Sequence, residues 1–277
     1  MNPARFLRCS LTALTVFLVL FAIRSFATNP TFGPYQVVRT LPNPPHTTGG
    51  LAFFNGYLYS VEDTFARIYQ IDPVTGQILA NWTATGFSPP SELPAGLASD
   101  GTGLWLLTRG QVNSLYHISL GPSTNVTKLS RYSLAGQEED LAYVNGFFMS
   151  PELNGPIRTI DPANGAFVGS IPSPYDATYG LTFDGSTLLA GNGLNGTIWQ
   201  ISPQDGTVLD TWQSGVAQCR GLAYDLSSQT LFIATAGSGI VVAQIPEPKL
   251  SGIVALAAVI LIAKRRKGSR TPAATPA

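Results

Sequence analysis

Five stretches of this 277-residue sequence begin alike, and together they decide the fold. They read GLAFFNGYLYSVE (50–62), GLASDGTGLWLLTR (96–109), DLAYVNGFFMSPE (140–152), GLTFDGSTLLAGN (180–192) and GLAYDLSSQTLFIAT (221–235). The leucine in second place recurs at positions 51, 97, 141, 181 and 222, at intervals of 40 to 46 residues. Self-similarity at a fixed interval of this length indicates a repeat architecture.

Turn residues divide each repeat into short apolar runs. Asn55-Gly56 and Asn145-Gly146 separate the first two runs of their repeats, and glycine tolerates the positive φ of tight hairpin turns. A further turn, IDPVTG at 71–76 or IDPANG at 160–165, separates the third run from the fourth. We therefore expect each repeat to form four antiparallel strands. Four strands at this interval are typical of a β-propeller blade.

The last repeat lacks its fourth strand. It supplies a third run, GIVVAQI at 239–245, and then meets Pro246. The segment YQVVRTLP at 35–42 resembles the outer strands of the other repeats, so we expect it to pair with the last blade and close the ring. The prediction is an all-β domain over residues 28–245, a five-bladed propeller of four-stranded antiparallel blades.

The N-terminal residues have the pattern of an export signal. Arg5 and Arg8 precede the 13-residue apolar run LTALTVFLVLFAI (11–23), and small residues precede a predicted cut after Ala27. Residues 1–27 are therefore predicted to be a signal peptide, which would leave Cys219 as the single cysteine of the exported domain. We expect Cys219 to be a buried packing residue.

The charges are segregated along the chain. Residues 28–247 contain seven basic and sixteen acidic residues, a net charge of −9, whereas the two ends carry basic residues and no acidic ones. An acidic central domain argues against nucleic-acid binding, which requires a basic patch on the folded domain.

A short apolar segment, residues 250–263, lies near the C-terminus. As a helix its 14 residues reach about 21 Å at 1.5 Å per residue, less than the hydrocarbon core of roughly 30 Å. The basic residues that follow it are expected to stay in the cytoplasm, with the tail 268–277, and to hold the bulk of the protein outside; they are Lys264, Arg265, Arg266 and Lys267.

The order Pro246-Glu247-Pro248, apolar helix and basic cluster resembles the PEP-CTERM sorting signal of Gram-negative bacteria. The resemblance makes residues 246–267 a sorting segment and implies an exosortase as processing partner. It also implies a transient inner-membrane stage, later release to the cell surface or medium, and a link to envelope proteins or the extracellular polysaccharide of biofilms.

The sequence contains none of the common catalytic or phosphate-binding motifs, and it has two histidines. The candidate site comes from topology, because the loops before the first strand and after the second strand of each blade open on one face around the propeller axis. Those positions form a predicted ligand-binding rim of Glu62, Asp63, Arg109, Glu139, Asp140 and Glu152, with Glu92, Glu138, Asp176, Asn192 and Arg220 beside them. Calcium is the candidate ion, on Glu62, Glu139, Asp140 and Glu152, because hard cations bind carboxylate oxygens; a solvated acidic surface is the alternative.

The repeats also resemble two propeller groups. The phrases GLA and IDPVTG are similar to NHL-like extracellular binding repeats, and GGLAFFNGYLY (49–59) with GLWLLT (103–108) resembles the five-bladed glutaminyl cyclases. Ala52 stands where the cyclases have an acidic residue, which favours binding over cyclase activity. Two functions therefore remain: an exported binding or scaffold propeller, and an extracellular lyase or cyclotransferase that uses rim carboxylates for acid–base chemistry.

Overall fold

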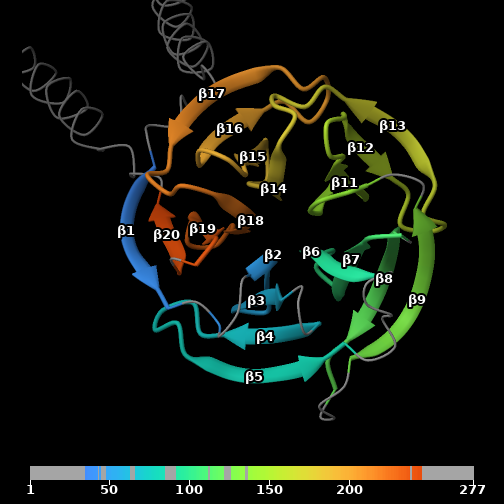
Figure 1. Ribbon diagram of the computed structural model, residues 1–277, viewed down its shortest axis with the longest axis horizontal. Helices are drawn as coiled ribbons and strands as arrows, with labels where there is room; N and C mark the ends of the chain where they lie inside the picture. The colour runs from blue at the N-terminus through green and yellow to red at the C-terminus, as the bar shows by residue number, and fades with distance from the viewer. Residues whose placement is uncertain are drawn as a thin grey trace, which may run out of the picture. The chain divides into compact units, whose positions relative to one another are not determined.

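The computed structural model describes residues 35–42, 44, 48–62, 66–84, 92–111, 113–121, 126–134, 137–237 and 239–244. They belong to one compact unit, residues 34–277. The described strands form five four-stranded antiparallel sheets arranged around an axis, which confirms the five-bladed propeller (Figure 1). The predicted signal peptide and the sorting segment lie outside the described residues. Within the described ranges, the structure contains no helix of the length and apolarity needed to cross a membrane.

Each blade runs from an inner strand at the axis to an outer strand at the circumference. Blade 1 consists of β2 (Thr48–Phe54), β3 (Tyr57–Glu62), β4 (Arg67–Ile71) and β5 (Ile78–Thr83). Blade 2 consists of β6 (Leu93–Ser99), β7 (Leu104–Arg109), β8 (Asn113–Ser119) and β9 (Thr127–Leu134). Blade 3 consists of β10 (Ala142–Val144), β11 (Phe147–Pro151), β12 (Ile157–Ile160) and β13 (Phe167–Ile171). Blade 4 consists of β14 (Thr178–Phe183), β15 (Leu188–Asn192), β16 (Thr197–Ile201) and β17 (Val208–Gln213).

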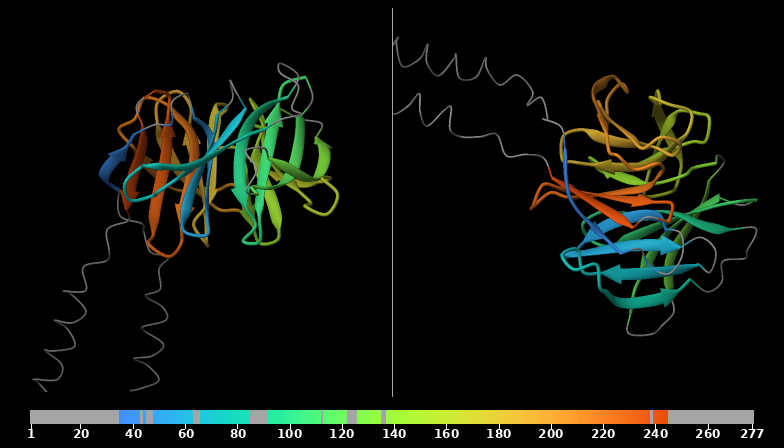
Figure 2. Two further views of the ribbon diagram at one scale, coloured as in Figure 1. Left: turned by 90° about the horizontal axis from the view of Figure 1, so that it is seen from below. Right: turned by 60° about the vertical axis from the view of Figure 1, so that its left-hand side comes forward.

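Blade 5 joins the two ends of the domain, as predicted. It consists of β18 (Cys219–Asp225), β19 (Thr230–Thr235), β20 (Ile240–Gln244) and, as its outer strand, β1 (Gln36–Leu41). Strand β1 pairs antiparallel with β20, from Gln36 opposite Gln244 to Leu41 opposite Ile240. Figure 2 shows β1 lying along β20 at the edge of this blade. Closure by a segment about 200 residues away in sequence pairs the outer edge of β20.

The turns have the backbone geometry that their residues indicated. Asn55 and Gly56 have φ values of 50° and 81°, and Asn145 and Gly146 have 50° and 95°, as expected for two-residue hairpin turns. In the second type of turn, the Asp72 carboxylate accepts hydrogen bonds from the backbone N–H groups of Val74 and Thr75. Local side-chain chemistry thus sets where the strands of a blade reverse.

The hydrophobic core is divided among the interfaces between neighbouring blades. Five clusters of buried residues occur, and each combines side chains from two adjacent blades. Leu97 and Leu106 of blade 2, for example, pack with Val61 of blade 1, and all three are fully buried. A single sheet cannot cover both of its faces, so stacking provides the burial, at about 1.5–3 kcal/mol for each large apolar side chain.

Cys219 is fully buried in the cluster between blades 4 and 5, as predicted. Burial raises the pKa of its thiol, and the nearby Asp140 raises it further. The thiol is therefore held in its protonated, unreactive form and serves as packing.

Glycines allow the inner strands to approach one another at the axis. A Cβ atom on Gly50 of β2 would lie 2.5 Å from Cα of Gly96 on β6, and one on Gly221 of β18 would lie 2.9 Å from Cα of Gly50. Backbone packs against backbone here, which explains why four of the five repeats begin with glycine. The third repeat has Asp140 in the equivalent position.

Candidate functional site

The predicted rim residues lie at one end of the strands, as the topology required. Glu62 at the end of β3 pairs with Thr48 at the start of β2, and Arg109 at the end of β7 pairs with Leu93 at the start of β6. Glu152 forms a bridge with Glu138 in the same way. We call this end of the propeller the rim face. Asp63 lies outside the described residues.

Two of the rim carboxylates, Glu139 and Glu152, form ion pairs with arginine. Arg109 donates to Glu139, which is 7% exposed. Arg158 donates to both oxygens of Glu152, at 2.7 Å in each case. The arginine partner of each carboxylate thus comes from an adjacent strand or blade.

The remaining rim carboxylates also have separate surroundings. Glu62 is fully buried and accepts a hydrogen bond of 3.4 Å from the Tyr69 hydroxyl, while Asp176 is exposed. Glu92 accepts from Tyr116 and Arg131, both at 2.8 Å. In the described ranges, no group of three or more His, Cys, Asp or Glu side chains is arranged to hold a metal ion. The calcium candidates Glu62, Glu139, Asp140 and Glu152 are thus not brought together in such a group.

Asp140 lies at the propeller axis, and its surroundings indicate a structural role. Its carboxyl is fully buried, and Oδ2 accepts a hydrogen bond of 2.9 Å from the backbone N–H of Leu181 in blade 4. Burial raises the pKa of Asp140 well above its usual range, although backbone N–H groups of Leu181, Leu141, Leu222 and Leu97 lower it. Those four leucines come from four blades, so this one side chain links most of the ring. Its Oδ1 atom has no hydrogen-bond partner.

Glu138 is the buried carboxyl of the rim face without a hydrogen bond to either oxygen. Its pKa is raised to about 7, mainly by burial and to a smaller extent by the carboxylates of Glu152 and Glu139, while its own backbone N–H and Arg158 act in the opposite direction. Glu138 is therefore the rim carboxyl best suited to hold and release a proton near neutral pH.

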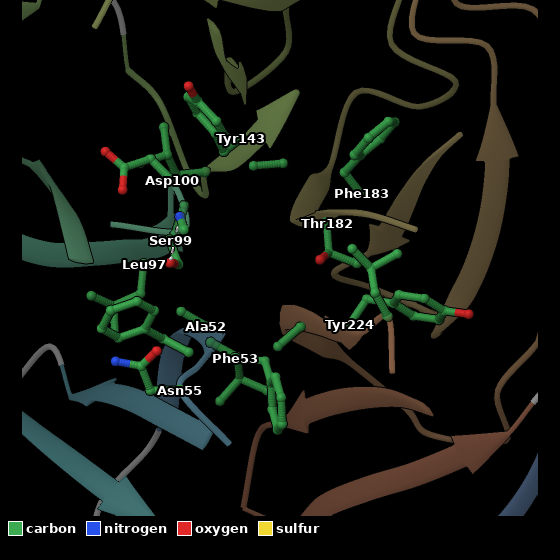
Figure 3. A pocket seen from close by; sticks show the side chains of 18 of the residues that line it. Ala52, Phe53, Asn55, Leu97, Ser99, Asp100, Tyr143, Thr182, Phe183 and Tyr224 are labelled. Atoms are coloured by element: carbon green, nitrogen blue, oxygen red, sulfur yellow. Dashed lines mark hydrogen bonds between the residues drawn. The ribbon is translucent and has the colours of Figure 1, made fainter. Parts of the chain in front are cut away.

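A funnel opens on the opposite face of the propeller, which sequence reasoning did not predict. Its volume is about 440 Å³. The residues that line it lie at the ends of the inner strands and in the turns that lead into the second strands. Tyr143, Phe183, Ala52 and Leu97 are among the residues that line it, and Figure 3 shows the rings of Tyr143 and Phe183 directed away from its centre, toward the core clusters against which they pack. The sequence pattern that could have indicated the funnel is the residue three places after the initial Gly or Asp of each repeat. These residues are Phe53, Ser99, Tyr143, Phe183 and Tyr224. Four of these five are aromatic.

The funnel is lined mostly by uncharged groups. Asp100 is the one carboxylate among the lining residues, and its own turn satisfies it. Oδ1 accepts from the backbone N–H groups of Thr102 and Gly103, and Oδ2 accepts from the Trp105 indole, each at 2.8 Å. Burial raises the pKa of Asp100, but these hydrogen bonds outweigh it and bring the pKa below the usual value. The wall thus offers aromatic surface without a group suited to acid–base catalysis.

Comparisons with known proteins agree on the fold. No protein-family model and no curated protein sequence matches the chain. The structure of glutaminyl cyclase from Myxococcus xanthus is similar, with 19% identity, a TM-score of 0.64, and coverage of 76% of this chain and 95% of that one. The PQQ-bound aldose sugar dehydrogenase of Streptomyces coelicolor is similar at 12% identity and a TM-score of 0.53, covering 76% and 99%. At these identities the likeness shows the fold, and the chain belongs to the class of five-bladed β-propeller proteins.

Proposed function

We propose that this chain is an exported bacterial binding propeller whose funnel holds an uncharged, ring-shaped ligand such as a sugar unit of an extracellular polysaccharide. The observation that carries the proposal is a cavity of about 440 Å³ whose lining is mostly uncharged and includes aromatic residues from four blades, Phe53, Tyr143, Phe183 and Tyr224. Ligand sites typically have volumes of about 300–1,000 Å³, mostly apolar walls and few polar groups. Aromatic faces provide large contact areas for the apolar faces of sugar rings.

Calorimetric titration with a panel of neutral oligosaccharides tests the funnel. We expect Tyr143→Ala and Phe183→Ala to weaken binding of the best ligand at least about tenfold, because each removes aromatic surface from a residue that lines the cavity. Tyr175→Ala is the matched control, since Tyr175 is an exposed aromatic residue that precedes β14 on the rim face. Absence of binding by any oligosaccharide, or equal loss in the control, would contradict the proposal.

Export and sorting form the second part of the proposal. Their support is the charged and apolar pattern of residues 1–27 and the Pro-Glu-Pro, apolar and basic order of residues 246–267. An exosortase is then the processing partner, and the mature protein starts at Thr28 and ends close to Pro246. Mass spectrometry of surface and secreted material checks both ends; recovery of the full-length chain alone, in the membrane, argues against it.

Glu138 favours a second candidate function, an extracellular lyase or cyclotransferase working on the rim face. A carboxyl whose pKa lies near 7 suits general acid–base catalysis at neutral pH. The test is release of ammonia from peptides with an N-terminal glutamine, and of unsaturated ends from acidic polysaccharides. Activity that Glu138→Gln abolishes would support an enzyme, and the absence of both activities would remove this candidate.

A further inference from the structure

The arginines of the rim face differ in how their charge is balanced. Arg109, Arg131 and Arg158 each form an ion pair, with Glu139, Glu92 and Glu152 respectively. In the described part of the chain, Arg220 of β18 forms no ion pair. Its side chain is partly buried, and its Nε atom is buried without a hydrogen-bond partner. The guanidinium lies 5.6 Å from the centre of the Tyr179 ring and donates one long bond of 3.4 Å to Gln218.

A second unsatisfied donor lies on the neighbouring blade. Asn192 at the end of β15 is fully buried. Its Oδ1 accepts from the backbone N–H of Leu194 at 2.7 Å, whereas its Nδ2 has no partner. The residues just before Asn192 and Arg220 are in contact, since a Cβ atom on Gly191 would lie 2.3 Å from Sγ of Cys219. Two buried donors without acceptors thus occur at the junction of blades 4 and 5, where each costs free energy unless a ligand satisfies it.

The carboxylate whose pKa Arg220 lowers is engaged by another arginine. Glu139 is paired with Arg109, although Arg220 is near enough to lower the Glu139 pKa as well. The carboxyl of the next residue, Asp140, is fully buried, and burial raises its pKa. Glu139 thus has its ion pair with Arg109, and the Arg220 guanidinium forms no ion pair of its own among the described residues.

We propose that Arg220 and Asn192 form a binding site on the rim face for the carboxylate of an organic acid. A carboxylate brings one negative charge, which matches the single charge of the Arg220 guanidinium, whereas a phosphate brings nearly two. The planar guanidinium matches the two oxygens of a carboxylate, and Nδ2 of Asn192 supplies a neutral donor beside it. The site is separate from the aromatic funnel, which opens at the other end of the same strands.

The experiment is calorimetric titration of the full-length chain with D-glucuronate, with glucose and inorganic phosphate as comparison ligands. We expect glucuronate to bind, to weaken as NaCl is raised, and to be preferred over both other ligands. Arg220→Gln should weaken glucuronate binding about 10- to 100-fold, as expected for a hydrogen bond to a charged group. Asn192→Ala should weaken it less.

Two control variants distinguish binding at Arg220 from a general effect of charge and from binding in the funnel. Arg39→Gln removes the same charge from an exposed strand, where Arg39 donates to the Pro73 carbonyl oxygen, and should leave glucuronate binding unchanged. Tyr143→Ala in the funnel should also leave it unchanged, so the funnel proposal and this one fail independently. The inference is overturned if glucuronate gives no heat, if phosphate binds more tightly, or if folded Arg220→Gln binds as well as the wild type.

Discussion

The side chains at the propeller axis determine how closely the inner strands approach one another. Four repeats place glycine at the closest approach of the inner strands, and the fifth places Asp140 there. The difference gives the ring one carboxyl that the backbone N–H groups of several blades share. The sequence predicted Asp140 as a calcium ligand, but in the structure its carboxyl is fully buried at the axis.

We predict that Asp140→Ala lowers the free energy of unfolding by roughly 1–3 kcal/mol. The substitution leaves the buried N–H of Leu181 without its acceptor, and unsatisfied buried donors cost about that much. Urea denaturation followed by tryptophan fluorescence measures the change. Asp205→Ala, in an exposed turn, is the control and should have the smaller effect. Equal stability of Asp140→Ala and the wild type would show that the axis does not depend on this carboxyl.

Glu138 makes stability depend on pH in the direction opposite to a typical paired carboxylate. Its pKa is about 7 in the folded state and near 4.5 when unfolded, so the folded state binds more protons between these values. Stability is therefore fully present below about pH 4.5 and falls as pH rises through about 7. We expect Glu138→Gln to flatten this dependence and to be more stable than the wild type at pH 8, by on the order of 2 kcal/mol.

Urea denaturation at pH 4.5, 6 and 8 measures this effect. The difference between the variant and the wild type isolates Glu138, because Asp140 and Glu139, whose pKa values are also raised, titrate in both proteins. Parallel pH profiles for the two proteins would mean that the Glu138 carboxyl is charged in the fold at neutral pH.

Among the secondary-structure elements, the inner strands are the most constrained and the outer strands the least. The inner strands contact both neighbours at the axis, whereas β5, β13 and β17 are mostly exposed. The same amino acid therefore has different roles in the two places. A glycine of an inner strand allows backbone contact, and a glycine of an outer strand faces open surroundings.

We predict that Gly50→Ala prevents folding or destabilises the protein by about 3 kcal/mol or more. The new Cβ would lie 2.5 Å from backbone atoms of Gly96 and Leu97, which cannot move without separating blades 1 and 2. Gly169→Ala on β13 is the matched control, because its nearest neighbour would be a Thr159 side-chain atom at 3.9 Å. Thermal unfolding measured by circular dichroism compares the two, and similar melting temperatures would refute close packing at the axis.

The whole ring depends on the pairing of its first and last strands. Strand β1 covers the edge of β20, and its ends add Leu41 to the cluster between blades 5 and 1 and Tyr35 to the cluster between blades 4 and 5. Both side chains are buried, although most of the strand is exposed. Closure therefore links two core clusters in addition to pairing the backbone.

Deletion of residues 35–42 should prevent folding or lower the melting temperature sharply. The loss includes two buried side chains, at about 1.5–3 kcal/mol each, and the hydrogen bonds of the β1–β20 ladder. Val37→Thr is the control, because Val37 is 49% exposed and its replacement should have little effect. A deletion variant as stable as the control would show that four blades and an open fifth suffice.

The sequence by itself determined the fold of this protein, because strands and hairpins follow from local patterns. Apolar runs alternate with Asn-Gly and Asp-Pro turns, and each such pattern extends over only a few residues. The leucine that recurs at 51, 97, 141, 181 and 222 indicated the number of blades. The tertiary structure alone decided what surrounds each side chain. The partners of Asp140 include backbone groups of Leu97 and Leu222, more than 40 residues away on either side, so no local pattern could indicate that this acid is buried. For the same reason, no local pattern could indicate the funnel, which lies where five strand ends meet, or the ionic partner of Glu139, which belongs to another blade.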